Sequence, residues 1–167
     1  MSGPVRELPL VLIAEDGDEY RARLSRLLGG AFRFARAGCF AELRAALEPA
    51  SPPVSALLLD LDFRRTPPDR LIDEHGRPAP PADAPRLAAV QGILLLRALR
   101  HEGLGVPALL CADLDDPEQE RRLAEELAPL QISPSSEGLP RLAERLRALG
   151  ALADATGMRP PCPPVLR

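Results

Sequence analysis

The sequence contains no lysine, so its 21 positively charged side chains are all arginines. Any site that needs a lysine ammonium group is therefore excluded, however the chain is aligned with other proteins. Long apolar runs are also missing, and no segment is long enough to span a bilayer. Residues 1–9 lack the basic-then-apolar form of a signal peptide. We therefore expect no membrane association.

Cysteine is scarce, and positive charge is not in excess. The three cysteines, Cys39, Cys111 and Cys162, are an odd number without metal-ligand spacing, which favours a reduced cytoplasmic compartment over a disulfide framework. The net charge is −3 and the isoelectric point is near 5.5. Proteins that bind nucleic acid usually concentrate positive charge, so we expect no nucleic-acid partner.

Short apolar runs alternate with amphipathic helical patterns along the chain, which predicts an α/β fold with a buried parallel sheet. We expect one domain over residues 1–152, followed by a proline-rich C-terminal tail at 153–167. The predicted strands are 11–14, 32–35, 56–59, 107–111 and 130–132. The predicted helices are 18–28, 40–47, 88–102, 117–127 and 139–152. This order gives a doubly wound sheet of five strands.

Carboxylates follow two of the predicted strands. Glu15 and Asp16 come after the first strand, and Asp60 ends the third. In an open α/β sheet, ligands bind beyond the carboxyl ends of the strands, so these three side chains should converge there. Three close carboxylates are stable only when a cation, a basic partner or protonation removes charge. The sequence therefore predicts a Mg²⁺ site.

From residue 9 to residue 152, this arrangement resembles the receiver domain of two-component response regulators, which has a flavodoxin-like fold. The resemblance implies that Glu15 and Asp16 bind Mg²⁺ and that Asp60 accepts a phosphoryl group. Three other positions depart from the family pattern. Ala112 stands where a threonine or serine is expected, Ser133 replaces the lysine, and Leu130 replaces an aromatic switch residue. The resemblance also implies a cis bond between Ser133 and Pro134.

A long segment at 63–85 follows the third strand, where a receiver domain needs only a short loop. It is rich in proline, arginine and acidic residues. Long loops within compact domains are usually functional or disordered. One hypothesis is a lid in which Arg64, Arg65 or Arg70 supplies the charge of the missing lysine. The alternative is a mobile surface insertion.

Two functions compete. The first is an atypical or pseudo-receiver, not an enzyme, that acts through contacts with a histidine kinase or another signalling protein, or through a homodimer. The resemblance places its contact surface on the fourth helix, fifth strand and fifth helix. The residues that we expect to be exposed there are Arg121, Arg122, Glu125, Arg141, Glu144 and Arg145. The second is a true phospho-acceptor that uses Asp60 with Mg²⁺.

A third and separate hypothesis starts from the run Asp60-Leu61-Asp62. It resembles the opening motif of haloacid-dehalogenase-type phosphatases, in which the first aspartate is the nucleophile and the second is a general acid. Successive side chains on a strand point to opposite faces. Asp62 can therefore join Asp60 only if the strand ends between them.

Overall fold

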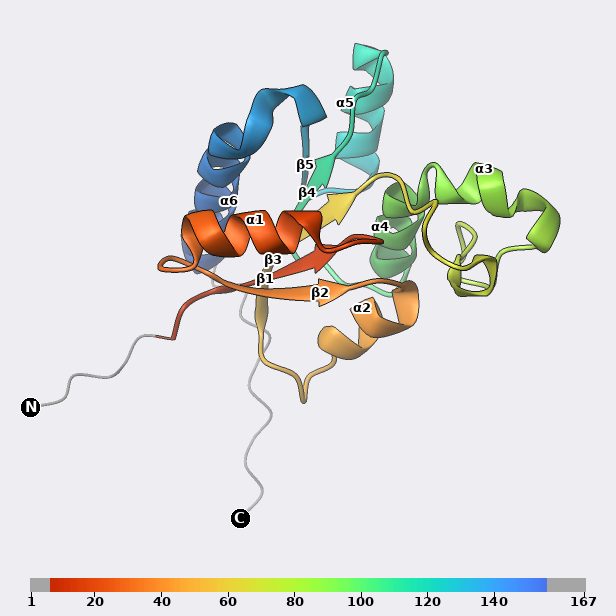
Figure 1. Ribbon diagram of the computed structural model, residues 1–167. Coiled ribbons are helices and arrows are strands. Elements are labelled where there is room, and N and C mark those ends of the chain that lie inside the picture. Colours follow the sequence, from red (N-terminus) through yellow and green to blue (C-terminus); the bar gives the residue numbers. More distant parts are fainter. Residues whose placement is uncertain (1–6, 156–167) are drawn as a thin grey trace, which may run out of the picture.

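The computed structural model describes residues 7–155, and their centre is a five-stranded parallel sheet (Figure 1). The strands lie in the order β2-β1-β3-β4-β5. This confirms the predicted doubly wound α/β fold. The strands are β1 (Leu10–Ala14), β2 (Arg33–Ala37), β3 (Val54–Asp60), β4 (Ala108–Cys111) and β5 (Leu130–Ser133).

Helices follow the strands along the chain, with one additional short helix between β3 and β4. The α-helices are α1 (Glu19–Leu28), α2 (Phe40–Ala46), α3 (Ala84–Ala88), α4 (Gln91–His101), α5 (Pro117–Glu126) and α6 (Gly138–Ala155). Three short 3₁₀ helices complete the set: η1 (Pro68–Arg70), η2 (Pro81–Asp83) and η3 (Ser135–Glu137). The start of α5 follows its sequence, because Pro117 occupies the first turn and the Asp116 carboxylate accepts the Glu118 N–H.

The period-two alternation of β1 divides the core into two layers. Val11 and Ile13 pack in one cluster with residues of α1 and α6, whereas Leu12 and Ala14 pack in the other with residues of α2 and α4. Helices therefore cover both faces of the sheet (Figure 1). This two-sided burial explains why β1 and β3 read as continuous apolar runs instead of alternating ones.

Two predicted boundaries are wrong. The second strand begins at Arg33 and continues to Ala37, and Phe32 packs instead in the core beside α1 and α6. The predicted helix over 88–102 is divided, since α3 ends at Ala88 and α4 begins at Gln91. The junction is held to the end of β3 by two bonds: the Gly92 N–H donates to the Leu61 carbonyl, and the Phe63 N–H donates to the Ala88 carbonyl.

The segment 63–85 packs against the body of the domain. It contains η1, η2 and an isolated bridge between Ile72 and Pro78. Leu71, Ile72 and Ala79 are buried in the cluster that also contains residues of α2 and α4. Gly76 lies so close to α2 that a Cβ added there would be 3.1 Å from the Phe40 ring. A mobile surface loop does not match this packing, and α4, which contributes to the same cluster, is buried at eight of its eleven residues.

Two further predictions concern a cis proline bond and the end of the domain. The cis bond among the described residues is Ala128–Pro129, so the expectation of a cis bond at Ser133–Pro134 is wrong. Helix α6 continues to Ala155, past the predicted domain end at 152. The tail beyond it, with Cys162, lies outside the described residues. Within residues 7–155, no helix is long and apolar enough to cross a membrane.

Replacing Gly92 by alanine should destabilise the fold, because the added Cβ would lie 2.0 Å from the backbone oxygen of Asp60. A strand carbonyl cannot rotate away as a side chain can. We expect the free energy of unfolding to fall by about 1–3 kcal/mol or more. Denaturant unfolding followed by circular dichroism measures this, with Gly105→Ala as the control because a Cβ there has no atom within 4 Å. Equal effects of the two substitutions would contradict this packing.

Candidate functional site

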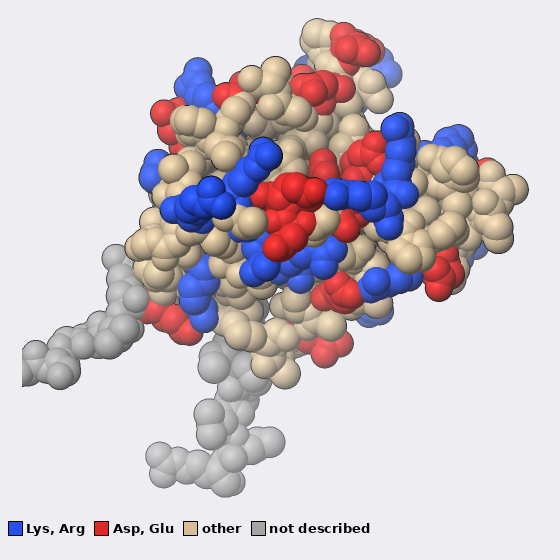
Figure 2. All heavy atoms as spheres, in the orientation of Figure 1, with Lys and Arg blue, Asp and Glu red and all other residues tan. Residues whose placement is uncertain are grey.

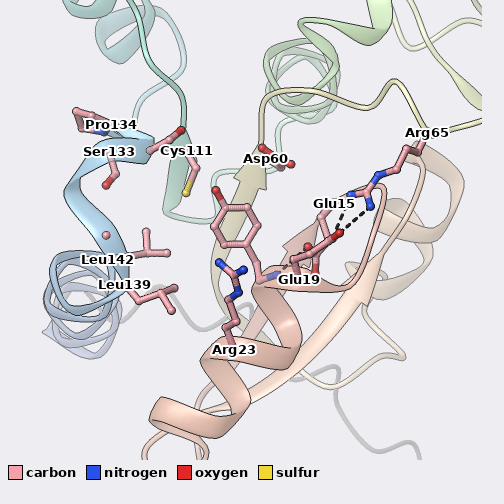
Figure 3. Close-up of a pocket in the computed structure, with 13 residues that line it drawn as sticks. Glu15, Glu19, Arg23, Asp60, Arg65, Cys111, Ser133, Pro134, Leu139 and Leu142 are labelled. Carbon is pink, nitrogen blue, oxygen red and sulfur yellow. Dashed lines mark hydrogen bonds and ion pairs between the residues drawn. The ribbon is translucent and has the colours of Figure 1, made fainter.

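The carboxyl ends of three neighbouring strands form a row of polar side chains. Asp60 of β3 is paired in register with Cys111 of β4, which is paired with Ser133 of β5. All three line a cavity of about 330 Å³ that extends between the starts of α1 and α6 (Figure 3). This is the sheet edge at which the sequence places a site.

Glu15 follows β1 directly and is almost fully buried, at 1% exposure. Its two carboxylate oxygens accept the backbone N–H groups of Tyr20 and Arg21, at 2.9 and 3.0 Å. These are first-turn donors of α1, which have no partner within the helix. Burial of this carboxylate is therefore compensated by hydrogen bonds, and its oxygens serve as a cap for α1.

Asp16 is held by Arg65, and we call Asp16, Glu19 and Arg65 the arginine clamp. The Arg65 backbone N–H donates to Asp16 Oδ2 at 2.9 Å, and its guanidinium Nη2 donates to Oδ1 at 2.8 Å. The same guanidinium binds Glu19 through two nitrogens, at 2.6 and 3.0 Å. The Asp16 side chain is only 5% exposed, so this pair is shielded on one side. Bidentate pairing of this kind is the strong form of an arginine–carboxylate contact.

Gly17 gives the clamp its space. A Cβ added at Gly17 would lie 2.0 Å from Glu19 Oε2 and 2.4 Å from Arg65 Nη2. Hydrogen bonds from Arg65 lower the pKa of Glu19 to about 2, and the two carboxylates raise the pKa of Arg65. Figure 2 shows acidic side chains gathered beside the start of α1, with basic side chains on either side of them. The clamp is therefore one part of a larger alternation of charge on this face.

Of the three carboxylates predicted for the site, Asp60 accepts the fewest hydrogen bonds that could offset its burial. Burial raises its pKa to about 6, helped by the charges of Asp16, Glu15 and Asp62, and opposed by the Leu61 N–H that donates to Oδ1 at 2.9 Å. Within the described residues, that backbone group is the only hydrogen-bond donor to the Asp60 carboxylate. Its other oxygen is available at the cavity.

No basic group or hydroxyl points at Asp60 from the ends of β4 and β5. Ala112 is buried and belongs to the opposite core layer, and Leu130 packs against that same layer. The Ser133 hydroxyl donates to Glu137 Oε2 at 3.3 Å, and Glu137 is paired in turn with Arg145. Ser133 is thus engaged with α6 and its neighbouring turn. The three departures noted in the sequence therefore leave this side of Asp60 without a charged or hydroxyl partner.

These carboxylates do not fit a resident Mg²⁺ ion in this arrangement. A hard cation needs several free oxygen ligands around one point. Glu15 uses its oxygens on backbone donors, and Asp16 uses its own on Arg65. Among residues 7–155, no three metal-ligating side chains lie close enough to hold a metal. The Mg²⁺ site inferred from the sequence stays a prediction that requires Arg65 to leave Asp16.

Solved structures identify the fold. No protein-family model and no curated protein matches this sequence. A Francisella response regulator receiver domain superposes with a TM-score of 0.61 at 14% identity, covering 86% of this chain and 97% of its own. The chain has the receiver-domain fold.

Two further structures agree. The receiver domain of NtrX from Brucella abortus has a TM-score of 0.58 at 14% identity, with 84% of this chain and 98% of that chain covered. A CheY-like receiver domain protein from Methanospirillum hungatei has a TM-score of 0.59 at 15% identity, with 90% and 99% covered. The receiver fold therefore spans the described part of the chain, at an identity too low to carry over the roles of individual residues.

Of the three arginines predicted to close the receiver-like acidic corner, Arg65 alone reaches it. Arg64 pairs with Asp62, at 3.2 Å. Arg70 pairs with Glu42 of α2 and with Cys39, which precedes α2, and with none of the three predicted site carboxylates. Asp62 also accepts the Arg64 N–H and does not line the cavity beside Asp60. The strand does end at Asp60, but this geometry does not favour a phosphatase that uses Asp60 and Asp62 together.

Several residues that line the cavity were not singled out in the sequence, among them Glu19, Tyr20, Arg23, Cys111, Leu139 and Leu142. Glu19 and Arg23 are charged residues on an amphipathic helix, which sequence reasoning assigns to solvent. Cys111 carried a usable signal, because it ends the predicted fourth strand and therefore belongs to the same sheet edge as Asp60. Burial raises the pKa of the Cys111 thiol to about 12, so this side of the cavity carries a neutral thiol at physiological pH.

The six residues expected on a contact surface lie on α5 and α6. Five of its six named residues are exposed, and Arg145 is partly buried. The arginines are paired within the chain: Arg121 with Glu118 and Glu125, Arg122 with Glu118, and Arg141 with Glu144. Its charges are therefore already balanced on the protein surface.

Proposed function

We propose that this protein is a receiver-like signalling module that acts through protein contacts, with a phosphorylation switch that is weak or absent. The arginine clamp is the observation that carries the proposal. Phosphoryl transfer places negative charge on three oxygens, and catalysis depends on cations already positioned around them. Here the Arg65 guanidinium is committed to Asp16 and Glu19 instead.

The side chains that respond to phosphorylation in receiver domains are also replaced in this chain. In the receiver domains that this chain resembles, a lysine, a hydroxyl and an aromatic ring respond to the phosphoryl group. The corresponding side chains here are Ser133, Ala112 and Leu130. Ser133 already donates to Glu137, and the other two carry no polar group. A phosphoryl group on Asp60 would therefore have few partners through which to change the surface of the domain.

One observation favours the alternative of a phospho-acceptor on Asp60, served by a histidine kinase or a small phosphodonor with Mg²⁺. Asp60 borders a cavity, keeps one carboxylate oxygen uncommitted and has a pKa of about 6, so it is largely ionised at neutral pH. An accessible, ionised carboxylate is a competent nucleophile. The two functions differ in one measurable product.

Intact mass after incubation with a small phosphodonor and Mg²⁺ separates them. We expect no mass gain, because Arg65 occupies Asp16 and no ammonium group faces Asp60. A receiver that retains the lysine and hydroxyl, treated in parallel, provides the positive control. A gain of one phosphoryl group that disappears in Asp60→Asn would show a working phospho-acceptor and overturn the proposal.

For the partner, we propose a histidine kinase or another signalling protein, or a second copy of the chain, bound through α5, β5 and α6. Exposure of Arg121, Arg122, Glu125, Arg141 and Glu144 supports this surface. Light scattering after gel filtration at two concentrations tests the homodimer. A mass that stays monomeric at both concentrations would remove the self-association part and leave the partner protein.

A further inference from the structure

The cavity at the sheet edge has the dimensions of a small-molecule site. Its volume of about 330 Å³ lies at the lower end of the range for such sites. Its walls come from α1, from the ends of β3, β4 and β5, and from the start of α6 (Figure 3). In open α/β sheets, ligands bind at this edge. The size suits a molecule of a few heavy atoms up to a small metabolite.

Most polar groups in the wall are already engaged by the protein. Glu15 accepts two backbone N–H groups, Glu19 is bound to Arg65, and Ser133 donates to Glu137. A ligand would gain little from these groups, since it would have to displace existing hydrogen bonds. Recognition must therefore come from the groups that remain.

Two opposite charges remain, on different walls. Arg23 of α1 has no ion pair or side-chain hydrogen bond to any residue within 7–155, and its guanidinium is directed toward the cavity (Figure 3). Asp60 of β3 keeps one oxygen uncommitted. Leu139, Leu142 and Cys111 add apolar surface to the wall. The cavity thus offers a cation, an anion and an apolar surface to one molecule.

The charged side chains that line the cavity also restrict which ligands can bind. Three carboxylates and two guanidinium groups line the cavity, namely Glu15, Glu19, Asp60, Arg23 and Arg65. A simple anion such as phosphate would gain Arg23 but meet repulsion from Asp60 and Glu15. A molecule with an ammonium group as well as a carboxylate satisfies both uncommitted residues.

We propose that this cavity binds a small zwitterion, with its carboxylate on Arg23, its ammonium on Asp60 and its apolar part against Leu139 and Leu142. A free amino acid with an aliphatic side chain is the simplest member of this class. The inference rests on the proposed function, in which a ligand at this edge would act as an input that does not require phosphorylation. A ligand bound in the cavity would contact α1, β3 and α6 at the same time.

The test uses L-leucine and 6-aminohexanoate as zwitterions of different charge separation. Isoamylamine and 4-methylpentanoate are the matched analogues that carry a single charge, and inorganic phosphate is the anion control. Binding is followed by ¹H–¹⁵N spectra of the full chain. We expect saturable shifts at Gly138 and Leu139 with at least one zwitterion, and binding about tenfold weaker, or none, with the analogues of single charge.

Two substitutions on α1 make the test specific. Arg23→Gln should reduce zwitterion binding to the level of isoamylamine, whereas Arg26→Gln, on the same helix but outside the cavity wall, should leave it unchanged. No saturable shift with either zwitterion, equal binding by Arg23→Gln, or tighter binding of phosphate than of leucine would each overturn the inference. Phosphorylation of Asp60 in the mass experiment would overturn the proposed function alone, so the two failures are distinguishable.

Discussion

Asp60→Asn should make the protein more stable at neutral and alkaline pH, although it removes the residue at the centre of the site. Burial and three neighbouring carboxylates raise the pKa of Asp60 from 3.8 to about 6. The folded state therefore binds this proton more tightly than the unfolded state does. Stability is lost as pH rises from about 4 to about 6, and the full cost is present above that window.

The expected gain for Asp60→Asn above pH 6 is about 1–2 kcal/mol in the free energy of unfolding, after a reduction for the partial exposure of the carboxylate. The difference between variant and parent should shrink toward zero near pH 4, where Asp60 is already protonated in the folded state. Urea unfolding at the two pH values measures it. Asp69→Asn, at an exposed position on η1, is the control and should show no such pH-dependent gain. A variant that is less stable than the parent above pH 6 would contradict the assignment.

Arg65→Ala should lower the stability of the protein, in contrast to Asp60→Asn. It leaves the shielded Asp16 carboxylate without its cation, beside Glu19 and near Asp60. We expect the free energy of unfolding and the melting temperature to fall, and to fall further than in Arg64→Ala, whose pair with Asp62 is exposed on both sides. Thermal unfolding followed by circular dichroism compares the two variants with the parent.

The same variant should also respond to divalent cations. Without the guanidinium, Asp16 Oδ1 is available beside Asp60, while the backbone N–H of residue 65 still donates to Oδ2. Mg²⁺ should therefore raise the melting temperature of Arg65→Ala and leave that of the parent unchanged. Gly17→Ala should reproduce part of this response, since its Cβ would displace the flexible ends of Arg65 and Glu19. Arg64→Ala is the matched control, because it loses only the exposed pair with Asp62. A parent protein that Mg²⁺ stabilises as strongly as Arg65→Ala would show that the clamp does not exclude the ion.

The position of the carboxylates at the sheet edge could be predicted from the sequence. The apolar runs ending in Glu15-Asp16 and Asp60 predict both the sheet and the edge at which the carboxylates meet, because strand order and the position of a site in a parallel sheet follow from topology. The absence of lysine is likewise a property of composition. Neither conclusion needs the position of any side chain.

The tertiary structure alone decided which charges are paired. Arg64, Arg65 and Arg70 are equivalent in the sequence, yet only Arg65 pairs with Asp16, because the turn that follows β3 brings it beside the start of α1. The packing of segment 63–85 against α2 and α4 could not be predicted from the sequence either, because its few apolar residues form no regular period. Electrostatic pairing depends on distances of a few ångströms between elements far apart in the chain, and residue types along a sequence do not contain those distances.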